Sequence, residues 1–189
     1  MMYNIILADP PWNFKTYSAK GQEYKSAANH YQTQSLEWIK NLNVNNIAAD
    51  DCCLFLWVTM PCLPQAFEVI MAWGFTYKTC AFTWVKKNKK ADSLFWGLGY
   101  WTRANSELCL LATKGNPKRI SKSVHQVIMS PIKEHSSKPD EARNRIVQLC
   151  GNIPRIELFA RNKTDGWACW GNEVDYNKSL DIKLLGIKR

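Results

Sequence analysis

Short apolar runs separated by polar stretches divide this chain into alternating strand-like and helix-like segments. The runs predict buried strands at residues 3–8, 52–58, 75–85, 108–113, 124–129 and 155–160. Apolar residues at helical spacing predict helices after Ser35, over 61–73 and over 140–150. Strands that alternate with helices indicate an α/β sheet with covered faces, in which ligands bind beyond the carboxyl ends of strands.

The polar stretches between these segments are predicted to be loops. Residues 13–33 have the composition of a mobile loop, and residues 114–122 form a basic turn. With 189 residues, of which 46% are apolar, the chain favours one domain over residues 1–176, with a basic insertion at about 86–122 and an accessory tail at 177–189. The apolar runs are far shorter than the roughly 18 residues of a membrane span, and no basic leader precedes the first run, so we expect a cytoplasmic protein.

Cysteine and histidine do not occur at metal-ligand spacing. The seven cysteines include no C-x-x-C pair, and His30, His125 and His135 are scattered. We therefore expect no metal site, and we expect the thiols to be buried as small hydrophobic groups.

The positive charge is concentrated in one quarter of the chain. The net charge is +9, and residues 78–122 hold ten Lys or Arg against Asp92 and Glu107. Such a concentration favours a polyanionic partner, and nucleic acid is the leading candidate. The predicted phosphate-binding residues are Lys86, Lys87, Lys89, Lys90, Arg103, Lys118, Arg119 and Lys122. Aromatic residues interleave with them, as expected of a surface that stacks bases: Trp84, Phe95, Trp96, Tyr100 and Trp101. The alternative is a solvated lysine loop beside buried core aromatics.

The tetrapeptide Asp9-Pro10-Pro11-Trp12 directly follows the first predicted strand. An exocyclic amine on a base is a weak nucleophile, so its methylation requires acceptors that hold the amine hydrogens. Asp9 offers a carboxylate, Pro10 offers a carbonyl with no N–H at Pro11, and Trp12 offers a flat face for the base. The alternative is that the two prolines only end the strand and that Trp12 is a core residue.

The chain also resembles a known family over about residues 4–175. The matching segments, in order, are 8–12, 30–35, 54–58, 72–75, 84–86, 97–101, 137–140, 157–161 and 170–173. They resemble the adenine N-6 methyltransferases of the branch that contains the catalytic subunit of the eukaryotic messenger-RNA methylating complex and many small bacterial and phage DNA enzymes. The resemblance implies a Rossmann-like α/β methyltransferase fold with a permuted motif order, in which the amine-binding loop precedes the donor-binding half.

The resemblance also implies S-adenosylmethionine as the methyl donor, which no glycine motif indicates, because no G-x-G-x-x-G occurs. It assigns Asp9 to the donor's amino group and Lys138 to the donor's carboxylate. The remaining assignments are Arg161 and Asn172 at the ribose and its neighbouring edge, Glu173 as an assisting residue, and Tyr31 in the base pocket.

The expected activity is transfer of a methyl group to the exocyclic amine of adenine in DNA. Two alternatives stay open, namely RNA as the substrate and a non-catalytic homologue that binds nucleic acid. The intact Asp9 and Trp12 favour a catalytic protein over a non-catalytic homologue, since a carboxylate repels the phosphates that a simple binding protein would hold.

Overall fold

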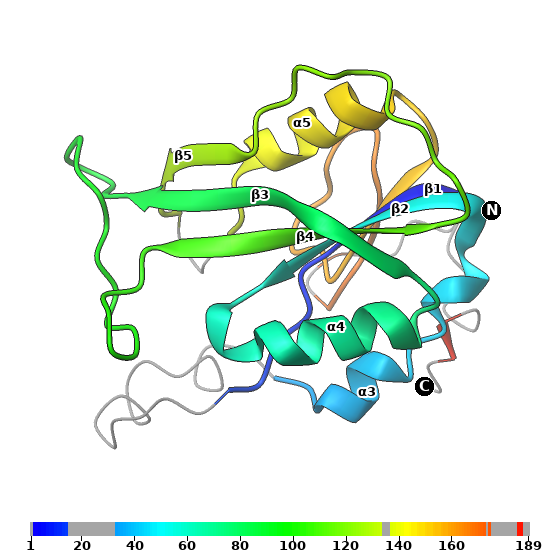
Figure 1. Cartoon of the computed structure of the whole chain (residues 1–189), viewed down its shortest axis with the longest axis horizontal. Helices are drawn as coiled ribbons and strands as arrows, with labels where there is room; N and C mark the ends of the chain where they lie inside the picture. The colour runs from blue at the N-terminus through cyan, green and yellow to red at the C-terminus, as the bar shows by residue number, and fades with distance from the viewer. Residues whose placement is uncertain (1, 15–32, 134–136, 173, 175–184, 187–189) are drawn as a thin grey trace.

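The structure is a computed structural model, and it describes residues 2–14, 33–133, 137–172, 174 and 185–186 (Figure 1). The strands are β1 (Tyr3–Ala8), β2 (Ala48–Val58), β3 (Thr76–Lys87), β4 (Ser106–Lys114), β5 (Val127–Pro131), β6 (Arg155–Leu158) and β7 (Ala168–Trp170). The helices are α3 (Leu36–Lys40), α4 (Leu63–Ala72) and α5 (Asp140–Cys150), with 3₁₀ turns η1 (Val44–Asn46) and η2 (Met60–Cys62).

Within the described residues, the strands form one sheet in the order β5-β3-β4-β2-β1-β6-β7. β1 lies between β2 and β6 and is parallel to both, and β7 extends the parallel part beyond β6. β4 is antiparallel to both of its neighbours, β2 and β3. The predicted α/β class is therefore confirmed, and β1 is a central strand whose carboxyl end opens beside the ends of its parallel neighbours.

Helices lie on both faces of the sheet at β1, which explains why this strand is apolar at every position except the half-buried Asn4 (Figure 1). Ile6 and Ala8 point into the cluster formed with α3 and α4, whereas Ile5 and Leu7 point into the cluster formed with α5. Successive side chains of a strand face opposite ways, so the part of a strand that is buried on both faces is apolar at consecutive positions, here from Ile5 to Ala8.

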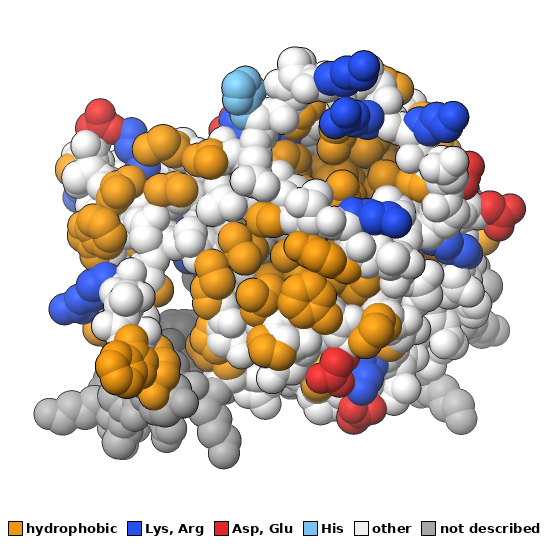
Figure 2. Space-filling view, in the orientation of Figure 1, with side chains coloured by type: hydrophobic (Ala, Val, Ile, Leu, Met, Phe, Trp, Pro, Cys, Tyr) orange, Lys and Arg blue, Asp and Glu red, His pale blue; other side chains and the backbone are white. Residues whose placement is uncertain are grey.

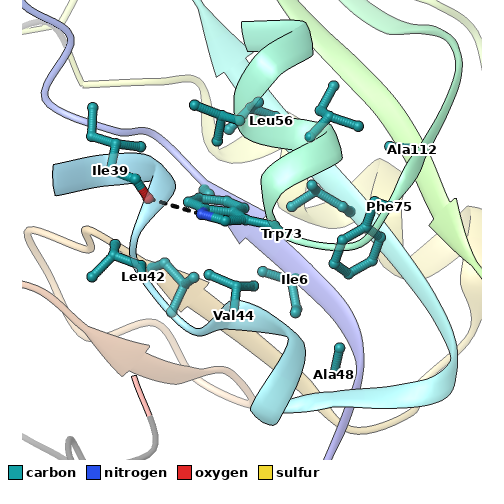
Figure 3. Close-up of a cluster of buried hydrophobic side chains, with 14 of the residues drawn as sticks. Ile6, Ile39, Leu42, Val44, Ala48, Leu56, Trp73, Phe75 and Ala112 are labelled. Carbon is teal, nitrogen blue, oxygen red and sulfur yellow. Dashed lines mark hydrogen bonds between the residues drawn. The ribbon is translucent and has the colours of Figure 1, made fainter. Parts of the chain in front are cut away.

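The α3 and α4 side of the core is organised around Trp73, which is fully buried (Figure 3). Its indole N–H donates to the carbonyl of Ile39 at 2.9 Å and thereby ties the end of α4 to α3. Ser35 caps α3 as the sequence predicts, because its hydroxyl accepts from the amide of Trp38 at 3.1 Å.

Some element boundaries differ from the predicted ones. β2 begins at Ala48, before the predicted 52–58 run, because Ala48 pairs with Tyr3 of β1. β7 is not predicted by the sequence pattern, because it has only three residues and is defined as a strand by its pairing with β6. The predicted accessory tail lies mostly outside the described residues, but Leu185 is fully buried in the core and its carbonyl accepts from the amide of Asn43.

The cysteines are free thiols, and five of the seven are buried, as predicted. Burial raises the pKa of Cys52 to about 12. In the part of the chain that the structure describes, no group of three His, Cys, Asp or Glu side chains is placed to hold a metal ion. No described helix is long and apolar enough to cross a membrane.

Candidate active site at the end of the central strand

Asp9 and Lys138 meet at the carboxyl end of β1 although the sequence separates them widely. The ammonium Nζ of Lys138 donates to Oδ2 of Asp9 at 2.7 Å. Asp9 follows β1 directly, and Lys138 stands just before α5. The side chain of Asp9 keeps 27% of its surface exposed and that of Lys138 keeps 12%, so it is mainly the Asp9 carboxylate that faces solvent.

α5 is held in place by a charged clamp that also fixes the position of Lys138. The guanidinium of Arg143 donates two hydrogen bonds of 2.7 Å to the carboxylate of Glu157 on β6. Such a bidentate pair defines both distance and orientation. Because β6 pairs with β1, the clamp fixes the start of α5 relative to the strand that ends at Asp9.

Glu107 of β4 is a third member of this charged group. Its carboxylate is buried and lies 3.2 Å from Nζ of Lys138 and 2.5 Å from Nζ of Lys86. The ammonium of Lys138 also lies 5.8 Å from the ring centroid of Trp57, at the end of β2. Four side chains thus alternate in charge along a chain of contacts that runs from Lys86 to Asp9.

The pKa values reflect this pairing. Burial alone would raise the pKa of Glu107, but Lys138 and Lys86 together bring it below its ordinary value. Burial alone would lower the pKa of Lys138, but Asp9 and Glu107 together raise it. The charged partners outweigh burial in both cases, so Glu107 stays negative and Lys138 stays positive at neutral pH.

We predict that Glu107→Gln lowers the stability at neutral pH and has a smaller effect in acid. A carboxyl group whose pKa is depressed by folding stabilises the native state above its unfolded pKa, near 4.5, and this contribution is lost as the pH falls through the folded pKa. The difference in unfolding free energy between the wild type and Glu107→Gln should therefore shrink below about pH 4.5. Urea unfolding of both proteins between pH 3 and 7 measures it, and a difference independent of pH would contradict the ion pairing.

The loop after β1 is held by hydrogen bonds at both of its ends. The carbonyl of Pro10 accepts from the amide of Trp12 at 2.8 Å, and the carbonyl of Pro11 accepts from the amide of Gln34 at 3.1 Å. From the sequence we predict that no N–H at Pro11 competes for the Pro10 carbonyl, but in the structure the next amide, that of Trp12, already donates to this oxygen. A carbonyl oxygen has two lone pairs, so the Pro10 oxygen retains capacity for a second donor.

The predicted stacking role of Trp12 is wrong for this structure. Trp12 is only 5% exposed and belongs to the core cluster on the α3 and α4 side. Its indole N–H donates to the carbonyl of Trp57 at 2.9 Å, which fastens the loop to the end of β2. The physical reason is that the apolar ring packs in the core and its single donor, the indole N–H, has a hydrogen-bond partner there. Trp12 thus holds Asp9 and Pro10 in place rather than presenting a face to a base.

Two further predicted residues, Arg161 and Asn172, follow the parallel strands β6 and β7. Ala8, Leu158 and Trp170 are level in the register of β1, β6 and β7, and Arg161 and Asn172 come shortly after the last two. The carboxyl ends of these parallel strands therefore share one edge with Asp9. Arg161 is half-buried and Asn172 is exposed. Tyr31 and Glu173 lie outside the described residues, so their predicted roles stay predictions.

The structure divides the predicted phosphate-binding residues into separate groups. Lys86 is neutralised by the buried Glu107 and packs over the ring of Trp84 at 5.1 Å, and Lys87 is paired with Asp92. Lys86 therefore belongs to the charged group around Lys138, which corrects its predicted role. Trp84 is likewise buried, so it cannot stack bases.

The exposed members of the predicted phosphate-binding set lie on two loops at opposite ends of β4. Val58 pairs with Leu108 near the start of β4, whereas Cys52 pairs with Lys114 at its end. The β3–β4 loop (residues 88–105) therefore lies at the same edge of the sheet as Asp9, and carries Lys89, Lys90 and Arg103. The β4–β5 loop (residues 115–126) starts at the opposite edge, and carries Lys118, Arg119 and Lys122. The cations form two surfaces instead of the single one predicted.

Comparison with known proteins identifies the family. The family model described as MT-A70 matches residues 3–173. The chain belongs to the MT-A70 family. The resemblance to the adenine N-6 methyltransferases is thereby confirmed, and so is the α/β class of fold that it implied.

The relatives of this MT-A70 protein differ in how much of their length it covers. It is 33% identical to the Type II methyltransferase M.MunI from Mycoplasma sp, over 97% of this chain and 82% of that protein. It is 31% identical to the N(6)-adenosine-methyltransferase subunit METTL3 of Danio rerio and 30% identical to the catalytic subunit METTL3 of Homo sapiens. In both of these comparisons the chain spans 30% of the length of the relative.

Glu107 is the residue of this MT-A70 site that we did not predict from the sequence. In the sequence it is one of two acids in a basic segment. One signal was present, because Glu107 shares its strand face with the buried Cys109 in an otherwise apolar run. A carboxylate on the inward face of a strand keeps its charge only when a cation lies beside it.

Proposed function

We propose that this protein transfers a methyl group from S-adenosylmethionine to the exocyclic amine of adenine in DNA. The observation that carries the proposal is the contact between Asp9 and Lys138 at the carboxyl end of β1. Opposite charges from two distant segments meet there at the edge where an α/β sheet binds its ligands.

The charges of this pair complement the amino-acid end of the donor. Lys138 would hold the carboxylate and Asp9 the ammonium, since each group then meets its opposite charge. Arg161 and Asn172, beyond β6 and β7, would hold the ribose and its neighbouring edge. When bound, S-adenosylmethionine supplies an electrophilic methyl group. The predicted permuted order of the family's motifs fits this assignment, because the Asp9 loop precedes Lys138, Arg161 and Asn172 in the chain.

The catalytic role falls to the loop that follows β1. Asp9 and the free lone pair of the Pro10 carbonyl would accept the two hydrogens of the target amine and orient its nitrogen. Trp12 acts as a positioning residue through its hydrogen bond to the Trp57 carbonyl. After transfer the nitrogen is cationic, so an acceptor of ordinary pKa is sufficient to remove its proton. A target adenine within a duplex must first be extruded from the stack.

We assign DNA as the substrate because M.MunI, a Type II methyltransferase, is the relative that this chain covers over 82% of its length. The adenosine methyltransferases of the METTL3 type are covered over 30% and favour RNA as the second candidate. A cytoplasmic location is consistent with either substrate. Incubation of the purified protein with labelled donor and unmodified DNA or RNA separates these possibilities. Label on adenine in DNA supports the proposal, label only in RNA supports the second candidate, and no label despite donor binding supports a non-catalytic homologue.

We predict that Lys138→Met weakens donor binding roughly 10- to 150-fold, the effect of losing a hydrogen bond to a charged group. Isothermal titration with S-adenosylmethionine measures the change. Lys118→Met, on the β4–β5 loop at the opposite edge of the sheet, is the matched control and should bind the donor normally. Thermal unfolding verifies that Lys138→Met is folded. We expect it to fold because Glu107 keeps Lys86 as its partner. Unchanged donor affinity in folded Lys138→Met would refute the assignment of the carboxylate to this residue.

The two exposed cationic loops give a matched test of DNA binding. Replacing Lys89, Lys90 and Arg103 together with alanine should weaken binding and flatten its salt dependence, by roughly 0.9 in the slope of log K against log salt for each lost phosphate contact. Replacing Lys118, Arg119 and Lys122 removes the same charge from the other edge and should have a smaller effect. Titrations of labelled duplex at several salt concentrations measure both. Equal losses in the two variants would mean that only net charge matters.

A further inference from the structure

The β3–β4 loop (residues 88–105) presents a cluster of large apolar side chains to solvent. Trp101 is 92% exposed, and the other members, Trp96, Leu98 and Tyr100, are between 58% and 61% exposed. Figure 2 shows hydrophobic side chains gathered at the end of this loop, beyond the ends of β3 and β4. Exposed apolar residues that occur together, rather than singly, mark a surface that contacts a partner.

The backbone of the loop holds this cluster outward. Trp101 has φ of +64°, a conformation that is rare for a bulky side chain. Gly99, at φ +62°, allows the tight approach beside it, because a Cβ there would lie 2.0 Å from the carbonyl oxygen of Thr102. Strain of this kind persists only where the surrounding structure enforces it, and it is concentrated at functional sites.

Hydrogen bonds at the base of the loop supply that enforcement. The side-chain amide of Asn105 donates to the carbonyls of Lys86 and Phe95, and the amide of Gly97 donates to the carbonyl of Ala104 at 2.6 Å. The side-chain amide of Asn88 donates to the Ser93 hydroxyl at 2.9 Å. These hydrogen bonds fix the backbone on both sides of Trp101, so the loop conformation itself holds the indole in solvent.

The charge around the cluster favours a polyanion as its partner. Lys89, Lys90 and Arg103 are exposed on the same loop, and its acid, Asp92, is paired with Lys87. A second copy of this chain is a poorer fit, because the copies carry a net charge of +9 each. Lys89, Lys90 and Arg103 lie at the sheet edge of Asp9, as the register of β2 and β4 requires.

We infer that Trp101 stacks on an unstacked base of the nucleic acid that the Asp9 site methylates. The inference rests on the proposed function for its ligand and adds a requirement to it, namely that the strand held near Asp9 exposes a base face to the indole. A single strand, or a duplex with an extruded nucleotide, meets that requirement. In this arrangement the cations of the loop bind phosphates, whereas Trp101 contributes to binding only where a base is present to stack on it.

The test compares Trp101→Ala with the wild type on two labelled single strands that differ only in their bases, one normal and one abasic. We expect Trp101→Ala to weaken binding to the normal strand roughly 5- to 150-fold, the range for loss of one base–aromatic stack. Binding to the abasic strand should be unchanged, and the salt slope on both strands should be unchanged because no phosphate contact is lost. Trp101→Phe should restore most of the affinity, because it retains an aromatic face.

Ile120→Ala is the matched control, since Ile120 is 72% exposed on the β4–β5 loop at the other edge of the sheet. It should bind both strands as the wild type does. Equal affinity of Trp101→Ala and the wild type for the normal strand would overturn the inference. So would a parallel loss on the abasic strand, or a loss explained by dissociation of a dimer in sedimentation experiments. Because no methyl transfer is measured, failure of the proposed activity in the labelled-donor assay is a separate result.

Discussion

Asp9→Ala is expected to reduce methyl transfer by roughly 10²- to 10⁴-fold, the range for loss of a positioned acceptor or proton-transfer group in a transition state. The carboxylate is the group at the end of β1 that meets Lys138, and it is the only acidic member of the Asp9–Trp12 loop. DNA binding should change little, because the exposed cations lie on other segments. Transfer of label from the donor to DNA, at saturating concentrations of both, measures the chemical step.

Asp50→Ala is the matched control for this experiment. Asp50 is an exposed carboxylate in β2, near the end of the sheet that lies away from Asp9. Its removal should leave methyl transfer and DNA binding at wild-type levels. Asp9→Ala should also remain folded, because Lys138 retains Glu107 as a partner at 3.2 Å. Wild-type activity in folded Asp9→Ala would disprove the assignment of this carboxylate to catalysis.

Trp12→Ala is expected to lower the free energy of unfolding by about 3–5 kcal/mol, the usual effect of removing a large buried aromatic side chain. Trp12 is 5% exposed within the core, and its N–H bond to the Trp57 carbonyl would be lost as well. Urea unfolding monitored by circular dichroism measures the change. Because the loop that carries Asp9 is anchored by this indole, methyl transfer should fall in parallel.

Trp12→Phe separates anchoring from stacking. Phenylalanine fills most of the buried volume but cannot donate to the Trp57 carbonyl, so the loss of stability should be smaller than for alanine. An indole that stacked on the target base would give the opposite pattern. In that case Trp12→Ala would have normal stability and a raised KM for DNA, which would contradict the buried position.

Much of the fold was predictable because the periodicity of apolar residues is a local property. The run from Tyr3 to Ala8 predicts a strand buried on both faces, and β1 is that strand. The predicted boundaries of α5, Asp140 and Cys150, coincide with those of the structure, because Pro139 precedes the first turn and Gly151 ends the last. β7 escaped prediction because three residues carry no period.

The candidate site was only partly predictable, because it depends on contacts between distant segments. The resemblance to the family brought Asp9 and Lys138 together, whereas neither composition nor spacing predicts their contact. Glu107 was missed because an isolated acid in a strand gains its meaning from the two lysines that approach it. The depth of Trp12 was misjudged because the exposure of an aromatic residue depends on what packs against it.

The amino-acid sequence by itself determined the alternation of strands and helices, the position of Asp9 directly after a buried strand, the excess of positive charge in residues 78–122, and the family. The tertiary structure decided which charges are neutralised and which face solvent. An antiparallel β4 sends the two cationic loops to opposite edges of the sheet and brings Lys86 against Glu107. The physical reason is that hydrophobic periodicity acts between near neighbours along the chain, whereas burial and ion pairing act between groups that only folding brings within a few ångströms.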